Sequence, residues 1–140
     1  MTMEEWIEFY NSKTNEPFRR DNRFDLFFLP EKGFCEIGLN QPHTMYIINQ
    51  LCGDAKFWKE KVDGLARDTG IIMCGTWCIR PEIYAYIRLF GYKVIKDDVL
   101  VDGKHKIVAE HKKTEKKGWA SPAYTYKFNG QTAYLITWEP

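Results

Sequence analysis

The feature that most constrains this fold is a strand–helix–strand run in the middle of the chain. Residues 44–51 (TMYIINQL) are almost continuously apolar, which is typical of a central strand. The hydrophobic period then changes to that of a helix over residues 54–69, which Gly70 ends, and residues 71–77 return to a strand pattern. Two strands joined through a helix pair in parallel by a right-handed crossover. We therefore expect one parallel strand pair at the centre of a sheet.

Shorter elements precede this unit. Residues 4–12 have an apolar face with helical spacing, and Thr2 followed by Glu5 is a capping-box pattern at the helix start. Residues 24–29 and 34–39 are aromatic-rich or alternating, and a Pro-Glu-Lys-Gly turn joins them. The sequence predicts a helix followed by a β-hairpin.

The later part of the chain predicts a third helix, a polar loop and more strands. The helix begins near Pro81, runs to about Phe90 and ends at Gly91. The predicted strands cover residues 92–100, 106–109, 124–128 and 133–138, with 111–121 as a polar loop and Asn129-Gly130 as a hairpin turn. The predicted fold is a single α+β domain over residues 1–140. Its mixed, mostly antiparallel sheet carries the central strand–helix–strand crossover and has helices on both faces.

Charge and composition narrow the function classes. The chain has 20 basic and 19 acidic residues and a net charge of +1, so no global field favours nucleic acid or a membrane surface. No apolar run approaches the ~20 residues of a membrane helix. The N-terminal segment is acidic and amphipathic, unlike a signal peptide. We expect a cytoplasmic protein without membrane contact.

Cysteine, histidine and lysine patterns add little specific chemistry. The four cysteines and three histidines are scattered without metal-ligand spacing, so we expect reduced, structural cysteines and no metal site. Residues 104–117 are rich in lysine. This segment is interpreted as a solvated loop, with attraction of an acidic acceptor or a nucleic-acid backbone as the alternative.

The most informative segment for function is the junction between strand 44–51 and the following helix. It has the sequence Gln50-Leu51-Cys52-Gly53-Asp54-Ala55. Gly53 allows a close turn, and the helix start at Asp54 offers unpaired amides and a positive dipole end. Such a site suits a pyrophosphate. The alternative is an ordinary strand-to-helix turn with an aspartate cap.

This Q-x-x-G-x-A segment is similar to the Q/R-x-x-G-x-G/A pyrophosphate loop of the GCN5-related N-acetyltransferases (GNAT family). Residues 84–94 (YAYIRLFGYKV) also resemble the late helix of that family, which ends in a tyrosine and a glycine–aromatic pair before a strand. The resemblance implies a GNAT-like fold that binds acetyl-CoA in a gap between two parting strands, and direct transfer of acetyl to a primary amine. The cofactor-binding residues it implies are Ile48, Gln50, Leu51, Cys52, Gly53, Asp54 and Ala55.

The catalytic residues are less well marked. The general-acid tyrosine of the family stands four residues before the glycine, which is Ile87 here, so the neighbouring Tyr86 is the candidate acid. Glu36 on the preceding strand is the candidate general base, with His43 and Glu82 as further candidates. The alternative function is a catalytically inactive protein of this fold, like divergent bacteriophage proteins. Its partner would be a second copy or another virion protein.

Overall fold

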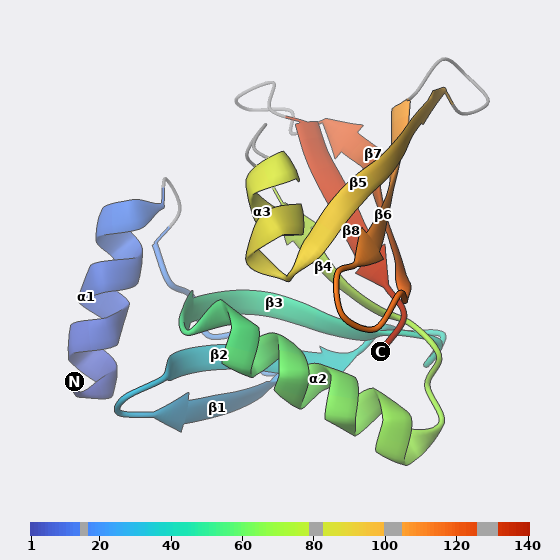
Figure 1. Cartoon of the computed structure of the whole chain (residues 1–140). Helices are drawn as coiled ribbons and strands as arrows, with labels where there is room; N and C mark the ends of the chain where they lie inside the picture. The colour runs from blue at the N-terminus through green and yellow to red at the C-terminus, as the bar shows by residue number, and fades with distance from the viewer. Residues whose placement is uncertain (15–16, 79–82, 100–104, 126–131) are drawn as a thin grey trace.

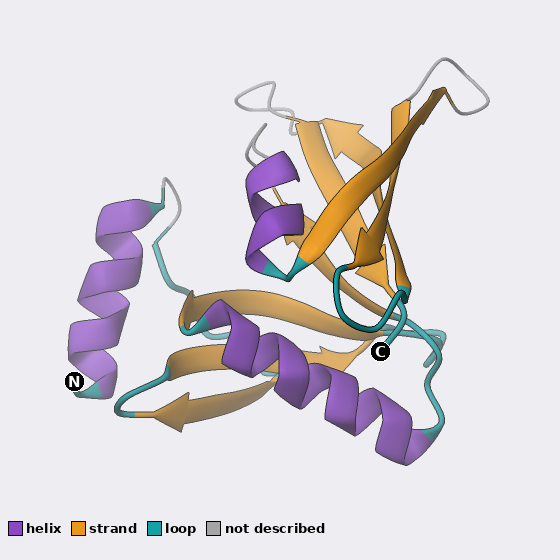
Figure 2. Ribbon diagram, in the orientation of Figure 1, coloured by secondary structure: helices purple, strands orange, loops and turns teal. Residues whose placement is uncertain are grey.

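The structure is a computed structural model in which residues 1–14, 17–78, 83–99, 105–125 and 132–140 are described. These residues form three helices and eight strands (Figures 1 and 2). The helices are α1 (Met3–Lys13), α2 (Ala55–Thr69) and α3 (Ile83–Leu89). The strands are β1 (Asp25–Leu29), β2 (Gly33–Leu39), β3 (Tyr46–Gly53), β4 (Cys74–Cys78), β5 (Tyr92–Val99), β6 (His105–His111), β7 (Lys117–Thr125) and β8 (Thr132–Trp138).

The eight strands form one mixed sheet in the order β1-β2-β3-β4-β8-β7-β6-β5. Strands β3 and β4, which α2 connects, are parallel, and every other neighbouring pair is antiparallel. The α+β class and the mixed, mostly antiparallel sheet are therefore confirmed. The predicted single domain over 1–140 stays a prediction.

The parallel pair at the centre of the sheet is short. It runs from Tyr46 opposite Cys74 to Ile48 opposite Thr76, and there the pairing stops, although both strands continue. Beyond that point β4 turns away from β3 (Figure 1). The sheet consequently has two arms, β1–β3 and β4–β8–β7–β6–β5, which are joined over three residue pairs.

Local signals set the ends of the first two helices. At α1, Thr2 accepts from the Glu5 amide and the Glu5 carboxylate accepts from the Thr2 amide, so the predicted capping box is present. At α2, Asp54 is the N-cap, and Gly70 ends the helix in the left-handed conformation, with φ 74°. The predicted start of α3 at Pro81 lies outside the described residues.

Helices α1 and α2 cover opposite faces of the β2–β3 arm. Neighbouring residues of a strand point to opposite faces. Phe34 packs against Tyr10 of α1, whereas Cys35 belongs to the buried core beside Trp58 of α2. Along this arm, the side-chain contacts agree with the predicted placement of helices on both faces.

The second arm is tied to α2 through a buried polar cluster. Lys59 and Asp63, one helical turn apart, form an ion pair of 2.7 Å, and both are almost fully buried. The indole of Trp138 donates to Asp63 at 2.6 Å, and the Lys59 ammonium lies over the rings of Tyr92 and Trp138. These contacts join α2 to β5 and β8.

The prediction of a polar loop over 111–121 is wrong. β6 extends to His111, β7 begins at Lys117, and only the short turn between them is irregular. Gly118 is buried, and a side chain there would stand 3.2 Å from the Tyr92 ring. Glycine and lysine have low strand propensity, so pairing with β6 and β8 decides this strand. The β7–β8 pairing is present, whereas Asn129-Gly130 lies outside the described residues.

Candidate functional site

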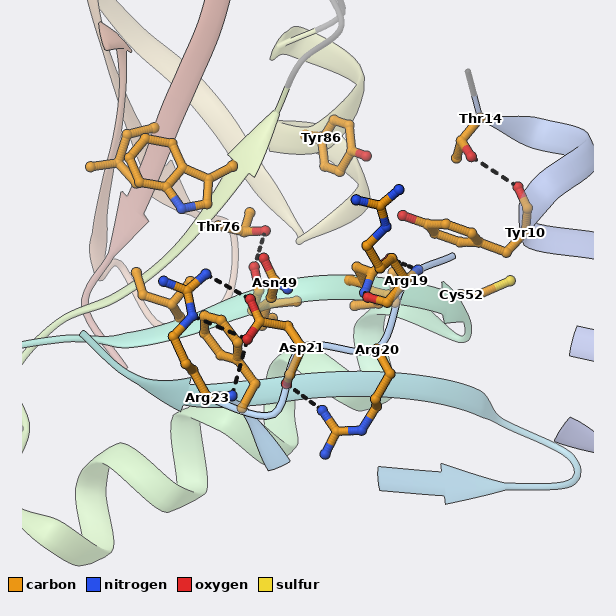
Figure 3. A pocket seen from close by; sticks show the side chains of 18 of the residues that line it. Tyr10, Thr14, Arg19, Arg20, Asp21, Arg23, Asn49, Cys52, Thr76 and Tyr86 are labelled. Carbon is orange, nitrogen blue, oxygen red and sulfur yellow. Dashed lines mark hydrogen bonds and ion pairs between the residues drawn. The ribbon is translucent and has the colours of Figure 1, made fainter. Parts of the chain in front are cut away.

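A groove of about 1570 Å³ lies where the two arms of the sheet part. Its lining comes from α1, the segment 17–24, β3, the β4 residues Thr76 and Trp77, and α3. The groove therefore combines elements from both arms, and Figure 3 shows how their side chains face one another across β3.

The floor of the groove is the edge of β3 that β4 has left. Backbone groups along a strand point alternately to its two sides. The Asp54 amide donates to the Lys32 carbonyl at 3.0 Å, so the Cys52 amide also points to β2. The Leu51 and Gly53 amides then point to the open edge. At the point of parting, the Thr76 hydroxyl donates to the Ile48 carbonyl at 2.9 Å.

A β-bulge in β3 changes which side chains face α1. The register with β2 shifts between Glu36 and Ile37, so that Asn49 and Gln50 together lie opposite Glu36. A bulge of this kind breaks the alternation of side chains between the two faces. Both amide side chains donate to the same carboxylate oxygen of Glu36, Asn49 at 3.0 Å and Gln50 at 2.6 Å.

Glu36 itself is fully buried and saturated with donors. Its second carboxylate oxygen accepts from the Arg20 guanidinium at 2.7 Å and from the Asp21 amide at 2.8 Å. All four donors belong to the protein, so both carboxylate oxygens are occupied by internal partners. Glu36 is also absent from the groove lining. Its role as general base stays a prediction. In the structure its carboxylate binds Arg20 and Asp21 and so holds segment 17–24 in place.

Gln50 holds the neighbouring residue of the same segment. Its side-chain oxygen accepts from the Arg19 amide at 3.2 Å, and its side-chain nitrogen donates to the Arg19 carbonyl at 2.6 Å. This paired contact fixes the backbone of Arg19 over β3. The Gln50 side chain, implied in cofactor binding, is therefore engaged with protein groups.

The start of α2 is capped by its own protein groups. The Asp54 carboxylate accepts from the Phe57 amide at 3.0 Å and from the Lys32 ammonium at 3.1 Å. These hydrogen bonds lower the pKa of Asp54. Gly53 has φ 109°, and a Cβ atom there would lie 2.2 Å from the Lys32 carbonyl oxygen. Glycine is therefore needed for the close approach to the chain just before β2. Asp54 does not line the groove, whereas Gly53 and Ala55 do.

The opposite wall comes from α3. Tyr86 lines the groove, and its ring packs edge-on against Phe90 with centroids 6.2 Å apart. Figure 3 shows the Tyr86 hydroxyl directed toward the space above β3. The candidate acid thus lies on the groove, across β3 from the segment 17–24.

Sequence reasoning missed the positive charge of this groove. Lys13, Arg19, Arg20 and Arg23 all line it, although the whole chain is almost neutral. Arg20 is paired with Glu36, and Arg23 is paired with Asp21 at 2.7 Å. Hydrogen bonds from Arg23 lower the pKa of Asp21 to about 2. Three arginines within residues 19–23 are the signal in the sequence that could have indicated it.

Most of the candidate residues meet at the groove. Tyr86 and six residues of the β3–α2 junction line it, namely Ile48, Gln50, Leu51, Cys52, Gly53 and Ala55. Of the alternative bases, His43 lines the groove and Glu82 lies outside the described residues. Cys52 is nearly buried, and burial raises the pKa of its thiol.

Among the described residues, no group of three His, Cys, Asp or Glu side chains could hold a metal ion. No described helix combines the length and apolar character that crossing a membrane requires.

No family model, curated protein or solved structure matches this chain.

Proposed function

We propose that the groove binds acetyl-CoA and that the protein transfers the acetyl group to an amine. The observation that carries this proposal is the parting of β3 from β4 after Ile48, which leaves a strand edge open inside a large groove. An extended, amide-bearing ligand can add to such an edge by backbone hydrogen bonds. The resemblance of residues 50–55 to a pyrophosphate loop supports the same ligand.

The residues of the groove fit this cofactor in part. The Leu51 and Gly53 amides would hold the pantetheine arm, and Ala55 at the first turn of α2 would approach the phosphates. The Asp54 and Phe57 amides are already bonded, so the helix start offers fewer donors than the motif implies. Positive charge from Lys13 is the additional attraction for a phosphate-bearing ligand.

The chemistry requires little from the protein beyond positioning. When bound, acetyl-CoA would supply a thioester from which a neutral amine takes the acetyl group: a C–N bond forms, the C–S bond breaks, and the proton lost from nitrogen is balanced by the one gained by the released thiol. The open edge of β3 would orient the ligand, and holding the thioester close to the amine would accelerate the transfer. Tyr86 would donate a proton from its hydroxyl to the leaving sulfur. His43 is the lining residue suited to accept a proton from the amine.

A second candidate function is binding without turnover. The observation that favours it is the saturation of both carboxylates near β3, since Glu36 and Asp21 each have an arginine partner. A protein of this kind would keep the groove for a ligand or a protein contact, as in an inactive virion component.

Thermal unfolding with acetyl-CoA tests the proposal. A ligand that binds only the folded state raises stability by RT ln(1 + [L]/Kd), about 2.7 kcal/mol at a hundredfold excess over Kd. We expect a rise in Tm that follows this dependence, and a smaller rise with ADP at the same concentrations, because ADP lacks the pantetheine arm. An unchanged Tm at millimolar acetyl-CoA contradicts the proposal. Binding without thiol release in the presence of amines favours the second candidate.

A matched pair of variants tests the placement of the cofactor. Leu51→Pro removes the side chain and the amide that points to the open edge, whereas Leu51→Ala removes the side chain only. We expect the acetyl-CoA affinity of the proline variant to be about tenfold below that of the alanine variant, because one backbone hydrogen bond is lost. Equal affinities would mean that the ligand does not use this edge.

A further inference from the structure

One guanidinium in the groove has no partner among the residues that the structure describes. Arg20 and Arg23 are paired with carboxylates, but no hydrogen bond or ion pair of the Arg19 side chain occurs within the described residues. Figure 3 shows this side chain rising from segment 17–24 into the groove, between Tyr10 and Tyr86. Arg19 therefore presents an unneutralised, bidentate donor to whatever occupies the space above β3.

The backbone beneath this guanidinium is held firmly. Gln50 contacts both backbone groups of Arg19, and the buried Glu36 binds the next two residues. A donor on such a support keeps its direction, so less freedom is lost when an anion binds.

Arg19 lies over Gln50, and the segment that follows it runs along the groove away from the start of α2. Segment 17–24 crosses the β2–β3 arm, from Phe18 against Phe34 to Phe24 beside Gly38. Phe34 is opposite Cys52, and Gly38 is opposite Ile47. Arg20 and Arg23 therefore follow one another along the groove from the side of Gly53 toward the residues where β3 and β4 are still paired.

The size of the groove leaves room for a second ligand. Its volume is about 1570 Å³, and its lining continues past the β3–α2 junction to Arg23, His43 and Leu89. We propose that the second ligand is a primary amine that also carries a carboxylate or phosphate, and that Arg19 is the residue that selects it. This inference rests on the proposed acetyl transfer.

The charge of the groove serves such an acceptor in two ways. An anionic group is attracted to Arg19, whereas a polyamine or a lysine-rich tail meets charge of its own sign. Nearby positive charge also disfavours the protonated amine and so lowers its pKa. The neutral amine is the form that attacks the acetyl carbon. A lowered pKa of the amine therefore lessens the need for a strong general base, since Glu36 is engaged by its four protein donors.

Three amines of one chain length provide the test. The probes are 4-aminobutanoate, its neutral amide and 1,4-diaminobutane, and their binding is followed by NMR titration of the Arg19 side-chain signal together with the backbone amides of β3. We expect the carboxylate to bind at least about tenfold more tightly than the amide, because a charge-assisted hydrogen bond is involved, and the diamine to bind most weakly. Added salt should reduce the preference.

Variants assign the preference to Arg19. Arg19→Gln should abolish it, and Lys13→Gln should reduce it by a smaller factor. Arg67→Gln is the control, because Arg67 is exposed on α2 outside the groove lining. A carboxylate preference that persists in Arg19→Gln, tightest binding by the diamine, or no binding by any probe overturns the inference.

Two further outcomes separate this inference from the proposed function. If Arg19→Gln weakens binding of CoA alone by the same factor, the guanidinium holds the phosphates of the cofactor and the inference is wrong. If acetyl-CoA neither binds nor reacts while the carboxylate preference depends on Arg19, the proposed transfer fails and the anion site stands.

Discussion

At the scale of single residues, Glu36 supports the wall of the groove. It lies beneath segment 17–24, is fully buried, and receives donors from that segment and from both bulge residues, Asn49 and Gln50. A buried ion that has all its partners is well tolerated, but loss of one partner leaves the others without an acceptor.

Glu36→Gln should therefore destabilise the protein strongly. The amide cannot accept from four donors, and its NH₂ group would face other donors. We expect a loss of about 3 kcal/mol in the free energy of unfolding, measured by urea denaturation. Glu31→Gln, at an exposed position on the β1–β2 turn, should stay within about 0.5 kcal/mol of the parent. An equally small effect at Glu36 would contradict the supporting role.

The buried cysteines offer a second check at this scale. Burial, together with the neighbouring negative charge of Glu36 for Cys35 and of Asp63 for Cys74, raises the pKa of both thiols well above the usual range. Because the thiolate is the reactive form, both thiols should react with a thiol reagent only after unfolding. Mass mapping after brief labelling of the native protein would show modification at Cys35 or Cys74 if this is wrong.

At the scale of elements, α2 is fixed at its start by Asp54 and along its length by the Lys59–Asp63 pair. The Asp54 carboxylate combines an N-cap hydrogen bond with an ion pair to Lys32, which stands on the β1–β2 turn. The lowered pKa of Asp54 means that folding favours its ionised form. This contribution is present above the unfolded pKa, near 3.8, and is lost as the pH falls through the lower folded pKa.

Substitution of Asp54 should reproduce this dependence. We expect Asp54→Ala to cost about 1 kcal/mol at neutral pH through loss of the cap. Asp54→Asn keeps the cap but not the charge, so its deficit should be smaller and should shrink as the pH falls below about 4. Unfolding curves at several pH values measure both effects. If the loss of stability in Asp54→Asn grew as the pH fell, it would contradict the expected direction.

The Lys59–Asp63 pair should show strong coupling between its members. Lys59→Met leaves a buried carboxylate alone, and Asp63→Asn leaves a buried ammonium alone while keeping an acceptor for Trp138. Each single change should cost about 3 kcal/mol, and the double variant much less than their sum. A double-mutant cycle from urea denaturation measures the coupling. Additive losses would show that the two groups act independently.

At the scale of the whole molecule, the two arms of the sheet meet over only three residue pairs between β3 and β4. The contacts of α2 with both arms complete the connection, through Cys35 and Ile37 on one side and Trp138 on the other. After Ile48, one edge of β3 has no partner strand among the described residues, and the groove lies along that edge.

Hydrogen exchange should reveal this open edge. The Leu51 and Gly53 amides face the groove, whereas the Cys52 amide faces β2, so the first two should exchange at least about tenfold faster. Acetyl-CoA should slow them and leave Cys52 little changed. Two-dimensional NMR after transfer to deuterium oxide measures the rates. Equal protection of all three amides without ligand would mean that the edge is closed.

The sequence by itself determined the elements whose cause is local. The capping box at Thr2 and Glu5, the left-handed stop at Gly70 and the hairpin of β1 and β2 depend on residues a few positions apart. The strand–helix–strand order also predicted the single parallel pair. Interactions of short range in the chain are strong enough to set these features in advance of any tertiary contact.

Only the tertiary structure decided where the chain's charges lie and how far its strands pair. The partners of Glu36 come from segment 17–24 and from a bulge in β3. Among the described residues, Arg20 and Arg23 pair with carboxylates and Arg19 does not. β7 forms because β6 and β8 pair with a segment of poor strand propensity. Each of these depends on groups distant in the chain, and packing and burial bring such groups together without leaving a periodic mark in the sequence.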